Sequence, residues 1–407
     1  MSTCSPEQSL LLATARTLPG PHVADLLRET TETLDWTRLI ETALEHGVTG
    51  LLCRSLLYQP DLVPDVLLEA ARQHLQEQRS TNQLLADQLT DILAELAAGG
   101  IEAIPFKGPT LALTAYGDLA LRSFRDLDFL IHEEQMQSCL EKLCEIGYTQ
   151  NLRLSPKQLR SFLTYSGQDI LYGNGAPIEP HWAFAPSTLA LDVDYRGIWD
   201  RAEYGDFNGR CILRLAPEDE LIILCVHGGK ERWTKLKWVA DIAEYIRSHP
   251  ALDWDELMER SKSQGLGRMV RLGLGLAERL IQAPLPPALT GWINKDEMAT
   301  NWCRHLADTF FEVDTRARSI YQLSRFHWEI RERQRDRWRY LLRTVTQPRE
   351  LHYMSIALPD RLFFLYTPYK MLHDYLALPT WLWLKRQRTP SDQLHETNEP
   401  ERTDAAR

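Results

Sequence analysis

The glycine pair Gly99-Gly100 separates two kinds of sequence pattern in this chain. Before the pair, residues 6 to 98 read as helical, and apolar residues at helical spacing predict one long helix from about Val66 to Ala98. After it, Ile101 to Phe106 is a short apolar run and Asp126 to Ile131 alternates as a strand does. Because glycine ends helices readily, the pair predicts the boundary between a helical region and a mixed α/β part.

The mixed pattern continues to about residue 215. Pro180 lies in the last of its predicted strands and indicates an edge strand, because proline has no N–H to donate to a neighbour. Two helices and two further strands are predicted in this part: Pro109 to Tyr116, Glu133 to Ile146, Gln168 to Tyr172 and Ala176 to Trp182.

The chain beyond residue 215 is mostly helical in pattern. Pro217 suits the first position of a helix that runs to His227, and Leu236 to Ile246 predicts a second helix beside it. The expected fold class is α+β, with a small mixed-sheet core embedded in N-terminal and C-terminal helical regions. The predicted parts are a helical region (1–100), an α/β core (101–215), a C-terminal helical domain (216–388) and a disordered, polar tail (389–407).

Bulk properties exclude several classes of protein. The seven cysteines are scattered without a CxxC pair, which argues against a disulfide framework or a thiolate zinc site. A formal charge of −10 argues against general nucleic-acid binding. No apolar run reaches the roughly 18 to 20 residues that a transmembrane helix needs, and the N-terminus lacks the pattern of a signal peptide, so a cytoplasmic location without a transmembrane segment is expected.

The stretch Asp126-Leu127-Asp128 is the first candidate for chemistry. Residues two apart on a strand face the same side, so Asp126 and Asp128 are expected to project together. Paired carboxylates repel unless a cation lies between them, and oxygen ligands suit a hard ion such as Mg²⁺ that bridges to phosphate. The pair therefore indicates phosphoryl or nucleotidyl transfer, although acidic pairs also occur on half-exposed strands without a metal.

Two other segments supply related groups. Glu179 and His181 also share a strand face, so Glu179 could complete a three-carboxylate site or act as a base, with His181 as its hydrogen-bonded partner. An ordinary surface role is the alternative for Glu179. Lys107-Gly108 ends a predicted strand and begins a helix, a place that favours phosphate. No GxxxxGK[ST] or GxGxxG motif is present, which argues against a P-loop or a dinucleotide-binding fold.

The combination of these elements resembles the uncharacterised nucleotidyltransferases of bacteria, distant members of the DNA polymerase beta-like nucleotidyltransferase superfamily. The chain departs from the wider superfamily in one respect, because Gly108-Pro109 stands, at a longer distance from Asp126, where a glycine-serine pair is usual. The elements that carry the resemblance are, in order, Lys107-Gly108, Tyr116, Arg122, Arg125, Asp126-Leu127-Asp128, Ile178-Glu179-Pro180-His181-Trp182, His227-Gly228-Gly229-Lys230 and Trp238 to Asp241.

The resemblance implies roles for these residues. Asp126, Asp128 and Glu179 would be the catalytic residues and would hold Mg²⁺ or Mn²⁺. Lys230 is implied as a phosphate contact and Asp241 as a positioning group, in a helical domain that closes over the nucleotide, with a plain helix-surface role as the alternative for each. The full set of implied nucleotide-binding residues is Lys107, Gly108, Arg122, Arg125, His181, Lys230 and Asp241.

The expected reaction moves a nucleoside monophosphate from a nucleoside triphosphate to a hydroxyl of an unidentified acceptor, and it releases pyrophosphate. The resemblance makes a sugar, a peptide, a protein or an RNA the candidate acceptors. Two alternatives stay open at this point. One is a noncatalytic nucleotide-binding or scaffolding protein, and the other is a phosphotransferase that uses the same metal site and releases a nucleoside diphosphate.

Two peripheral segments have unusual composition. Ten arginines lie between Arg316 and Arg349 against three acidic residues, Glu329, Glu332 and Asp336, which suits either an acidic partner or a solvated helix face paired with acids elsewhere. On either reading, Arg331→Ala is expected to affect partner binding at most. The aromatic segment Arg361 to Lys385 suits either a membrane surface or docking on its own protein, and its charges exclude a membrane span.

Overall fold

The computed structural model describes residues 4–20, 22–30, 33–150, 154–312 and 323–377. The chain divides into two compact units. Unit 1 consists of Met1–Arg153 and Leu163–Thr344, and unit 2 of Leu154–Phe162 and Val345–Arg407. The predicted tail (389–407) lies outside the described residues, and the four-part division drawn from the sequence stays a prediction.

The chain begins with helices, as its sequence pattern predicts. The predicted long helix is confirmed as α5, which ends where the N–H of Gly99 bonds back to carbonyls of the last turn. Gly100 follows with a φ of 72°, a conformation that favours glycine. The elements before the sheet are α1 (Pro6–Thr14), α2 (Val23–Thr30), α3 (Trp36–His46), α4 (Thr49–Leu57), η1 (Pro60–Leu62) and α5 (Asp65–Ala98).

A five-stranded mixed sheet follows, with the strand order β1-β2-β5-β4-β3. Strand β2 pairs antiparallel with β1 and parallel with β5, and this confirms the predicted α+β fold class. Its elements are β1 (Ala103–Pro105), α6 (Gly108–Thr114), η2 (Leu119–Leu121), β2 (Leu127–Ile131), η3 (Glu133–Gln135), α7 (Met136–Glu145), β3 (Thr149–Gln150), α8 (Pro156–Ser166), β4 (Leu171–Tyr172) and β5 (Ile178–His181).

The prediction that Pro180 marks an edge strand is wrong. Strand β5 lies inside the sheet, between β2 and β4. Strand β4 pairs with β5 at Ile178 alone, and the carbonyl of Pro180 accepts from the N–H of Asp169. A proline is tolerated because the short neighbouring strand does not extend its ladder to this position.

After β5, the regular elements of the described residues are helices apart from one β-hairpin. Helix α10 begins at Pro217, as predicted, and carries three acidic residues in its first turn, where they complement the helix dipole. The remaining elements are η4 (Ser187–Leu189), α9 (Tyr195–Arg201), β6 (Glu203–Phe207), β7 (Arg210–Arg214), α10 (Pro217–Lys230), α11 (Leu236–Ser248), α12 (Trp254–Ser263), α13 (Gly267–Ile281), α14 (Pro287–Asn294), α15 (Glu297–Asp308), α16 (Arg325–Glu329), α17 (Gln334–Thr346), α18 (Glu350–Ser355), η5 (Asp360–Leu365), α19 (Tyr366–Leu372) and the π-helix η6 (His373–Ala377).

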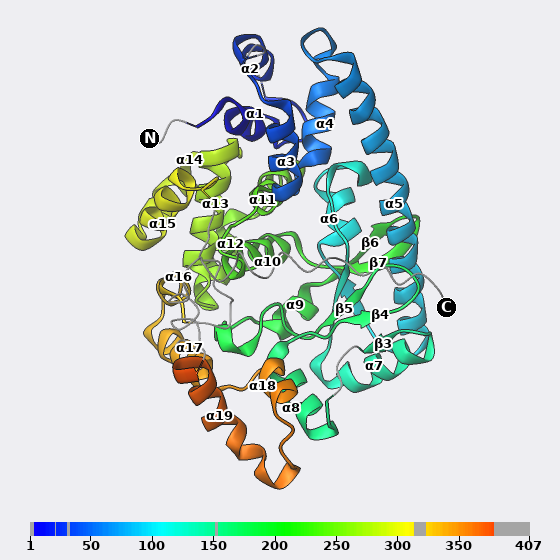
Figure 1. Ribbon diagram of the computed structural model, residues 1–407, viewed down its shortest axis with the longest axis vertical. Coiled ribbons are helices and arrows are strands. Elements are labelled where there is room, and N and C mark those ends of the chain that lie inside the picture. The colour runs from blue at the N-terminus through cyan, green and yellow to red at the C-terminus, as the bar shows by residue number, and fades with distance from the viewer. Residues whose placement is uncertain (1–3, 21, 31–32, 151–153, 313–322, 378–407) are drawn as a thin grey trace, which may run out of the picture. The chain divides into compact units, whose positions relative to one another are not determined.

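Unit 1 packs its sheet between helices from both halves of the sequence. Figure 1 shows α5 running beside the sheet, with α10 to α13 gathered on the other side. Leu130 of β2 packs with Ile198 of α9 and Ile223 of α10 in one buried cluster. A larger apolar core joins α1 to α5 with α10 to α15. The seven cysteines are free, which agrees with their scattered spacing.

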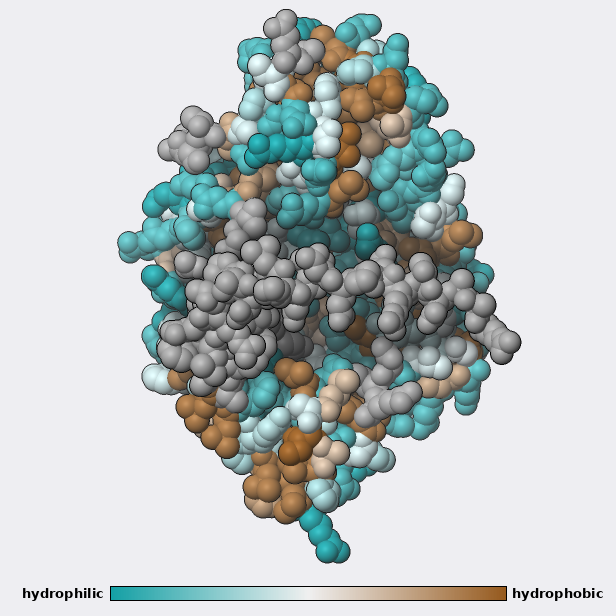
Figure 2. Space-filling view, viewed as in Figure 1, coloured by the Kyte–Doolittle hydropathy of each residue, from teal (hydrophilic) through white to brown (hydrophobic). Residues whose placement is uncertain are grey.

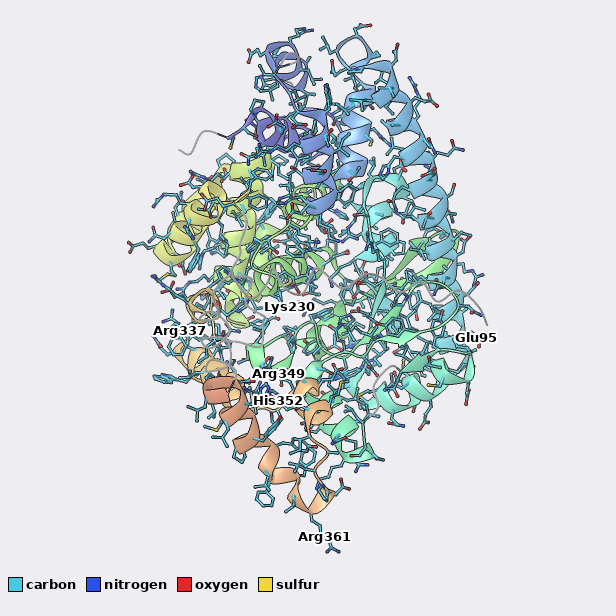
Figure 3. The ribbon with its side chains drawn as sticks, viewed as in Figure 1. Glu95, Lys230, Arg337, Arg349, His352 and Arg361 are labelled. Carbon is cyan, nitrogen blue, oxygen red and sulfur yellow. The ribbon has the colours of Figure 1, made fainter. Side chains whose placement is uncertain are left out.

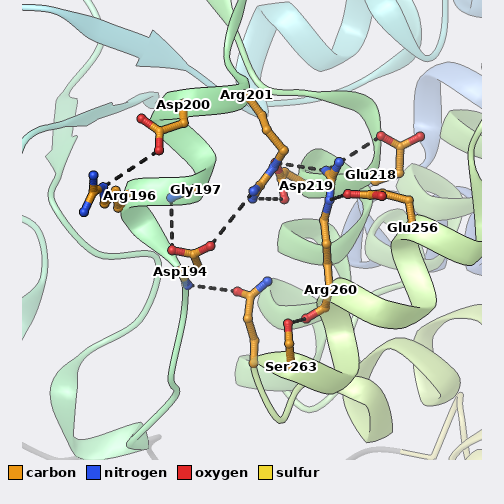
Figure 4. A network of polar contacts seen from close by, with 11 residues as sticks. Asp194, Arg196, Gly197, Asp200, Arg201, Glu218, Asp219, Glu256, Arg260 and Ser263 are labelled. Atoms are coloured by element: carbon orange, nitrogen blue, oxygen red, sulfur yellow. Dashed lines mark hydrogen bonds and ion pairs between the residues drawn. The ribbon is translucent and has the colours of Figure 1, made fainter.

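A buried carboxylate ties the mixed part of unit 1 to its C-terminal helices (Figure 4). Asp219, in the first turn of α10, accepts two hydrogen bonds from Arg201 of α9, at 2.8 and 3.0 Å. Arg260 of α12 lies 3.2 Å from the same carboxylate. Asp219 is 2% exposed, so its carboxylate is shielded from water. The contacts among α9, α10 and α12 therefore depend on this one buried charge.

We expect Asp219→Asn to lower the free energy of unfolding by about 2–4 kcal/mol, because two guanidinium groups lose the carboxylate that compensates them. Urea denaturation followed by circular dichroism measures this change. The matched control is Asp200→Asn, which removes the exposed partner of Arg196 in the same region and should change the free energy by less than about 0.5 kcal/mol. Equally small effects of both substitutions would show that Asp219 does not link these helices.

The arginine-rich segment is partly internal, which corrects its reading as a solvated face. Arg331 is 2% exposed, donates to the carbonyl of Leu189 and lies over the ring of Tyr340. Arg343 likewise donates to the carbonyl of Ser187. The expectation that Arg331→Ala affects only partner binding is therefore wrong, because the side chain holds the fold together. Arg316 and Arg318 lie outside the described residues.

Unit 2 combines a charged hub with an apolar surface. Asp374 accepts from Arg349 and Lys370 through one oxygen and contacts His352 through the other, and Figure 3 labels Arg349 and His352 side by side. Tyr366 is fully buried, so part of the aromatic segment packs on its own unit. Figure 2 shows hydrophobic side chains over this part of the chain. The exposed apolar residues of unit 2 include Leu351, Met354, Leu362, Phe364, Met371 and Leu372.

A membrane crossing needs a helix of sufficient length and apolar character, and none of the helices in the described ranges meets both conditions.

Candidate functional site

The parallel pairing of β2 with β5 brings the predicted acidic residues together. In this register Asp128 lies opposite Glu179, and Leu130 lies opposite His181. Asp126 comes one residue before β2, at its entrance. Two segments some fifty residues apart in the chain thus place their polar side chains on adjacent strands, as the alternation in the sequence predicts.

Short contacts connect these side chains. Nε2 of His181 lies 2.8 Å from Oδ1 of Asp128 and 3.7 Å from Oε2 of Glu179. The same Oε2 accepts a hydrogen bond of 2.7 Å from Nε2 of Gln168. The ammonium group of Lys107 lies 3.7 Å from Oδ1 of Asp128. The strand residues therefore form one polar cluster rather than separate surface groups.

The backbone at Lys107-Gly108 is unusual. Lys107 has a φ of 55° and a ψ of −138°, a conformation that residues with a Cβ seldom adopt, and Gly108 follows with a φ of 39°. The hydroxyl of Thr110 donates to the carbonyl of Lys107 and helps to hold this turn. Strain of this kind persists where the surrounding structure enforces it, and it is frequent at functional sites.

Arg122 is held in a buried ion pair. Its Nε and Nη2 donate to the two carboxylate oxygens of Asp241 on α11, at 2.7 and 3.0 Å. The hydroxyl of Tyr116 donates to the same carboxylate at 2.7 Å. Burial opposes the charge of Arg122, but Asp241 raises its pKa above the ordinary value. Asp241 thus fixes the orientation of the Arg122 side chain. Arg122 lines the pocket that the next paragraphs describe, whereas Asp241 does not.

The segment His227-Gly228-Gly229-Lys230 ends α10 beside the sheet. A Cβ at Gly228 would lie 2.3 Å from the ring of Trp233, so only glycine lets this indole pack here. Lys230, labelled in Figure 3, is 8% exposed and lies 3.4 Å from Glu231. The packing of Trp233 against the glycine explains how the helix end that carries Lys230 is fixed.

These groups line one pocket of about 280 Å³. Its charged side chains are balanced, with four acidic groups and four cationic groups in a small volume. The lining residues are Lys107, Gly108, Arg122, Phe124, Asp126, Asp128, Gln168, Glu179, His181, His227, Lys230, Glu231, Lys237 and Trp238.

The pocket shifts the pKa values of its acidic groups in opposite directions. Burial, followed by the charges of Asp128 and Glu179, raises the pKa of Asp126. Burial would do the same at Asp128, but Lys107 and the hydrogen bond with His181 hold the pKa of Asp128 well below its usual range. Neighbouring carboxylates with such different proton affinities are typical of functional sites.

Burial and neighbouring positive charges lower the pKa values of three basic groups in the pocket. Burial, and then the charge of Arg122, lowers the pKa of Lys237 to about 8. Burial and the charge of Lys107 lower the pKa of Lys230. The pKa of His227 falls well below its ordinary value because the ring is buried among cationic side chains. A polyphosphate entering the pocket would relieve this crowding of positive charge.

The structure gathers most, but not all, of the residues that the sequence singles out. Arg125 is exposed and lies outside the pocket lining, so its predicted phosphate contact stays a prediction. Asp241 contacts Arg122 instead of lining the pocket. Gln168 and Lys237 line the pocket but were not predicted. The alternation around Gln168 could have indicated its strand face, whereas no pattern marks Lys237 among the lysines of the chain.

The donor set fits a divalent cation. The ligand atoms of Asp128, Glu179 and His181 all lie within 4.8 Å of one another, and the carboxylate of Asp126 lines the same pocket. Carboxylate oxygens suit Mg²⁺ and Mn²⁺, and a single imidazole is compatible with Mn²⁺ and other transition metals. The residues present therefore fit the predicted metal.

A larger hollow of about 1070 Å³ lies elsewhere in unit 1, lined by α1, α3, α15 and α16. Among the described residues, the two groups of three metal-ligating side chains are Asp128 with Glu179 and His181, and His352 with His373 and Asp374. Neither group lines the larger hollow. Of the two groups, Asp128 with Glu179 and His181 lines the smaller pocket.

Comparison with known proteins shows the family of the chain. Residues 32–282 match the model of a family described as uncharacterised nucleotidyltransferase, and this match spans every residue of the pocket. The chain belongs to that uncharacterised nucleotidyltransferase family. Its mixed sheet and flanking helices are accordingly a nucleotidyltransferase core with helical regions.

Other comparisons are more distant. The chain is similar to a solved structure, the crystal structure of an antigenic nucleotidyltransferase-like protein from Paracoccidioides brasiliensis. The two chains are 15% identical, the match covers 53% of this chain and 92% of that chain, and the TM-score is 0.31. No curated protein matches the chain.

Glu220 on α10 makes the stability of unit 1 depend on pH. The side chain is 7% exposed, and burial raises its pKa to about 7, despite Arg214 and a hydrogen bond with Tyr245. The unfolded chain releases this proton near the ordinary pKa of 4.5, whereas the folded protein keeps it up to about pH 7. The folded state is therefore disfavoured progressively between these values, and fully above pH 7.

We expect Glu220→Gln to stabilise the protein at pH 8, by up to about 3 kcal/mol, and to change little near pH 4.5. Denaturant titrations of wild type and variant at the two pH values measure the difference. Tyr245→Phe, which removes the hydrogen-bond partner but keeps the carboxyl group, is the control and should not reproduce the gain. A gain that is equal at both pH values would contradict the assignment.

Proposed function

We propose that this protein is a metal-dependent nucleotidyltransferase that moves a nucleoside monophosphate from a nucleoside triphosphate to a hydroxyl of an acceptor, with release of pyrophosphate. One observation carries the proposal. Asp126, Asp128 and Glu179 share a small pocket with four cationic side chains, which come from the turn before α6, from α10, from α11 and from the segment before β2. Membership of the nucleotidyltransferase family supports the same reaction.

The acidic side of the pocket would hold the metal. Asp126, Asp128 and Glu179 are the proposed ligands of Mg²⁺ or Mn²⁺. The bound cation would neutralise phosphate charge and polarise the α-phosphorus. Glu179 is the proposed acceptor of the hydroxyl proton, because Gln168 holds one of its oxygens in place and leaves the carboxylate oriented toward the pocket.

The cationic side would bind the triphosphate. Lys107 lies next to Asp128 and can contact phosphate oxygens that share the metal. Arg122 enters the pocket in a fixed orientation because Asp241 binds it, and Tyr116 in turn donates to Asp241, so we assign Asp241 a positioning role. Lys230 and Lys237 add charge from the helical side. Such fixed cations stabilise the charge that develops on the leaving pyrophosphate.

We further infer that the family belongs to the DNA polymerase beta-like superfamily, on the order of its lysine-glycine, arginine and Asp-x-Asp motifs. A bacterial source, a cytoplasmic location and a sugar, peptide, protein or RNA acceptor stay predictions.

The test is transfer of label from α-³²P nucleoside triphosphates, supplied one at a time with Mg²⁺ or Mn²⁺ and cell extract. We expect wild type to label an acceptor and to release pyrophosphate. We expect Asp126→Asn/Asp128→Asn to lose at least about 100-fold in rate, because amides cannot hold the cation as carboxylates do. Asp91→Asn, on the exposed face of α5, is the matched control and should retain the wild-type rate.

The products separate the proposal from its rivals. Release of a nucleoside diphosphate with transfer of the γ-phosphate would identify a phosphotransferase. Tight nucleotide binding without any transfer would identify a nucleotide-binding or scaffolding protein. Transfer at the wild-type rate by the double variant would place the active site elsewhere.

A further inference from the structure

We propose that His181 is itself a ligand of the divalent cation, with Asp128 and Glu179, and that its imidazole makes the site favour a first-row transition-metal cation such as Mn²⁺ over Mg²⁺. The inference deepens the proposed function, since it concerns the same pocket. It changes the implied role of His181 from a contact of the nucleotide to a contact of the metal.

The position of Nε2 is the first reason. This nitrogen lies 2.8 Å from Oδ1 of Asp128 and 3.7 Å from Oε2 of Glu179. Because metal–ligand bonds to nitrogen and oxygen are about 2.0–2.2 Å long, donor atoms that share one ion stand about 3–4 Å apart. Both distances from Nε2 are close to this spacing, and the ligand atoms of the three residues all lie within 4.8 Å of one another. Asp126 is outside this group of three, although it lines the pocket.

The other ring nitrogen supports the same role. Nδ1 of His181 lies 3.4 Å from the carbonyl oxygen of Ala183. Nε2 carries the proton that it donates to Asp128. A cation that took the place of this proton would bind the Nε2 lone pair while the carbonyl of Ala183 kept the N–H of Nδ1, which is the usual arrangement of a metal-binding histidine. The ring of Phe106 packs edge-on at 5.0 Å, and His181 is only 2% exposed, so the imidazole is fixed toward the carboxylates.

The carboxylate ligands have outer partners as well. Gln168 donates to Glu179, and Lys107 lies beside Asp128. Outer contacts of this kind orient metal ligands and are a regular part of metal sites. A set of two carboxylates and one imidazole differs from the all-oxygen set that Mg²⁺ prefers, because nitrogen ligands favour transition metals.

The test uses Mn²⁺ alone, without nucleotide, as a paramagnetic probe. Pulsed electron paramagnetic resonance of the Mn²⁺-bound wild type should show coupling to a ¹⁴N nucleus. Protein grown with ¹⁵N-labelled histidine should show the ¹⁵N pattern instead. Mg²⁺ should displace Mn²⁺ only at an excess of about tenfold or more. These measurements need no substitution, so they do not depend on a variant that folds.

Two variants assign the nitrogen. His181→Gln should lose the coupling and weaken Mn²⁺ binding by about tenfold or more. His227→Gln, which alters the other histidine of the pocket, is the matched control and should keep the coupling. The proposal is overturned by wild type that does not bind Mn²⁺, by bound Mn²⁺ without histidine coupling, or by coupling that persists in His181→Gln.

The resonance experiment tests the role of His181 independently of the transfer assay. Histidine-coupled Mn²⁺ in a protein that transfers no nucleotide would uphold the ligand assignment and refute the proposed function. Nucleotide transfer by a protein whose Mn²⁺ shows no histidine coupling would do the reverse.

Discussion

The parallel pairing of β2 with β5 is the interaction on which the site depends. It sets Asp128 opposite Glu179 and brings His181 against Asp128, although the two strands are separated by α7, α8 and two short strands. A shift of one residue in this register would turn the carboxylates to the opposite face of the sheet. Leu130, packed against α9 and α10, fixes the face of β2 and thereby the direction of Asp128.

The site also requires cationic side chains from other elements close to these carboxylates. Lys107 comes from a strained turn, Arg122 from a buried ion pair with α11, and Lys230 from the end of α10. The Asp219 network joins α10 to α9 and α12, so it supports α10, the helix that supplies His227 and Lys230 to the pocket. Stability and function are therefore linked through the same helices, whose buried charges are individually unfavourable without their partners.

Much of this arrangement was accessible from the sequence. Glycine and proline positions and the change of periodicity located α5, β1, β2 and α10, because these signals act locally. The face shared by Glu179 and His181 followed from strand alternation.

What the sequence could not show depends on contacts between distant segments. Lys237 reaches the pocket because its aliphatic stem lies against Gly47, at the end of α3, where a Cβ would stand 2.8 Å away. Pro180 indicates an edge strand because the sequence pattern does not show that β4 is short and that its ladder with β5 stops at Ile178. Arg331 looked like one of many surface arginines, whereas the carbonyl of Leu189 holds it inside unit 1.

The central claim is that one pocket binds both the metal and the triphosphate. Crystals grown with Mn²⁺ and a nucleoside triphosphate analogue that carries a noncleavable α,β-methylene bridge, measured at the manganese absorption edge, test it most directly. We predict an anomalous peak between Asp128 and Glu179, with the triphosphate against Lys107 and Lys230. A metal peak or an ordered triphosphate outside the pocket would contradict the claim.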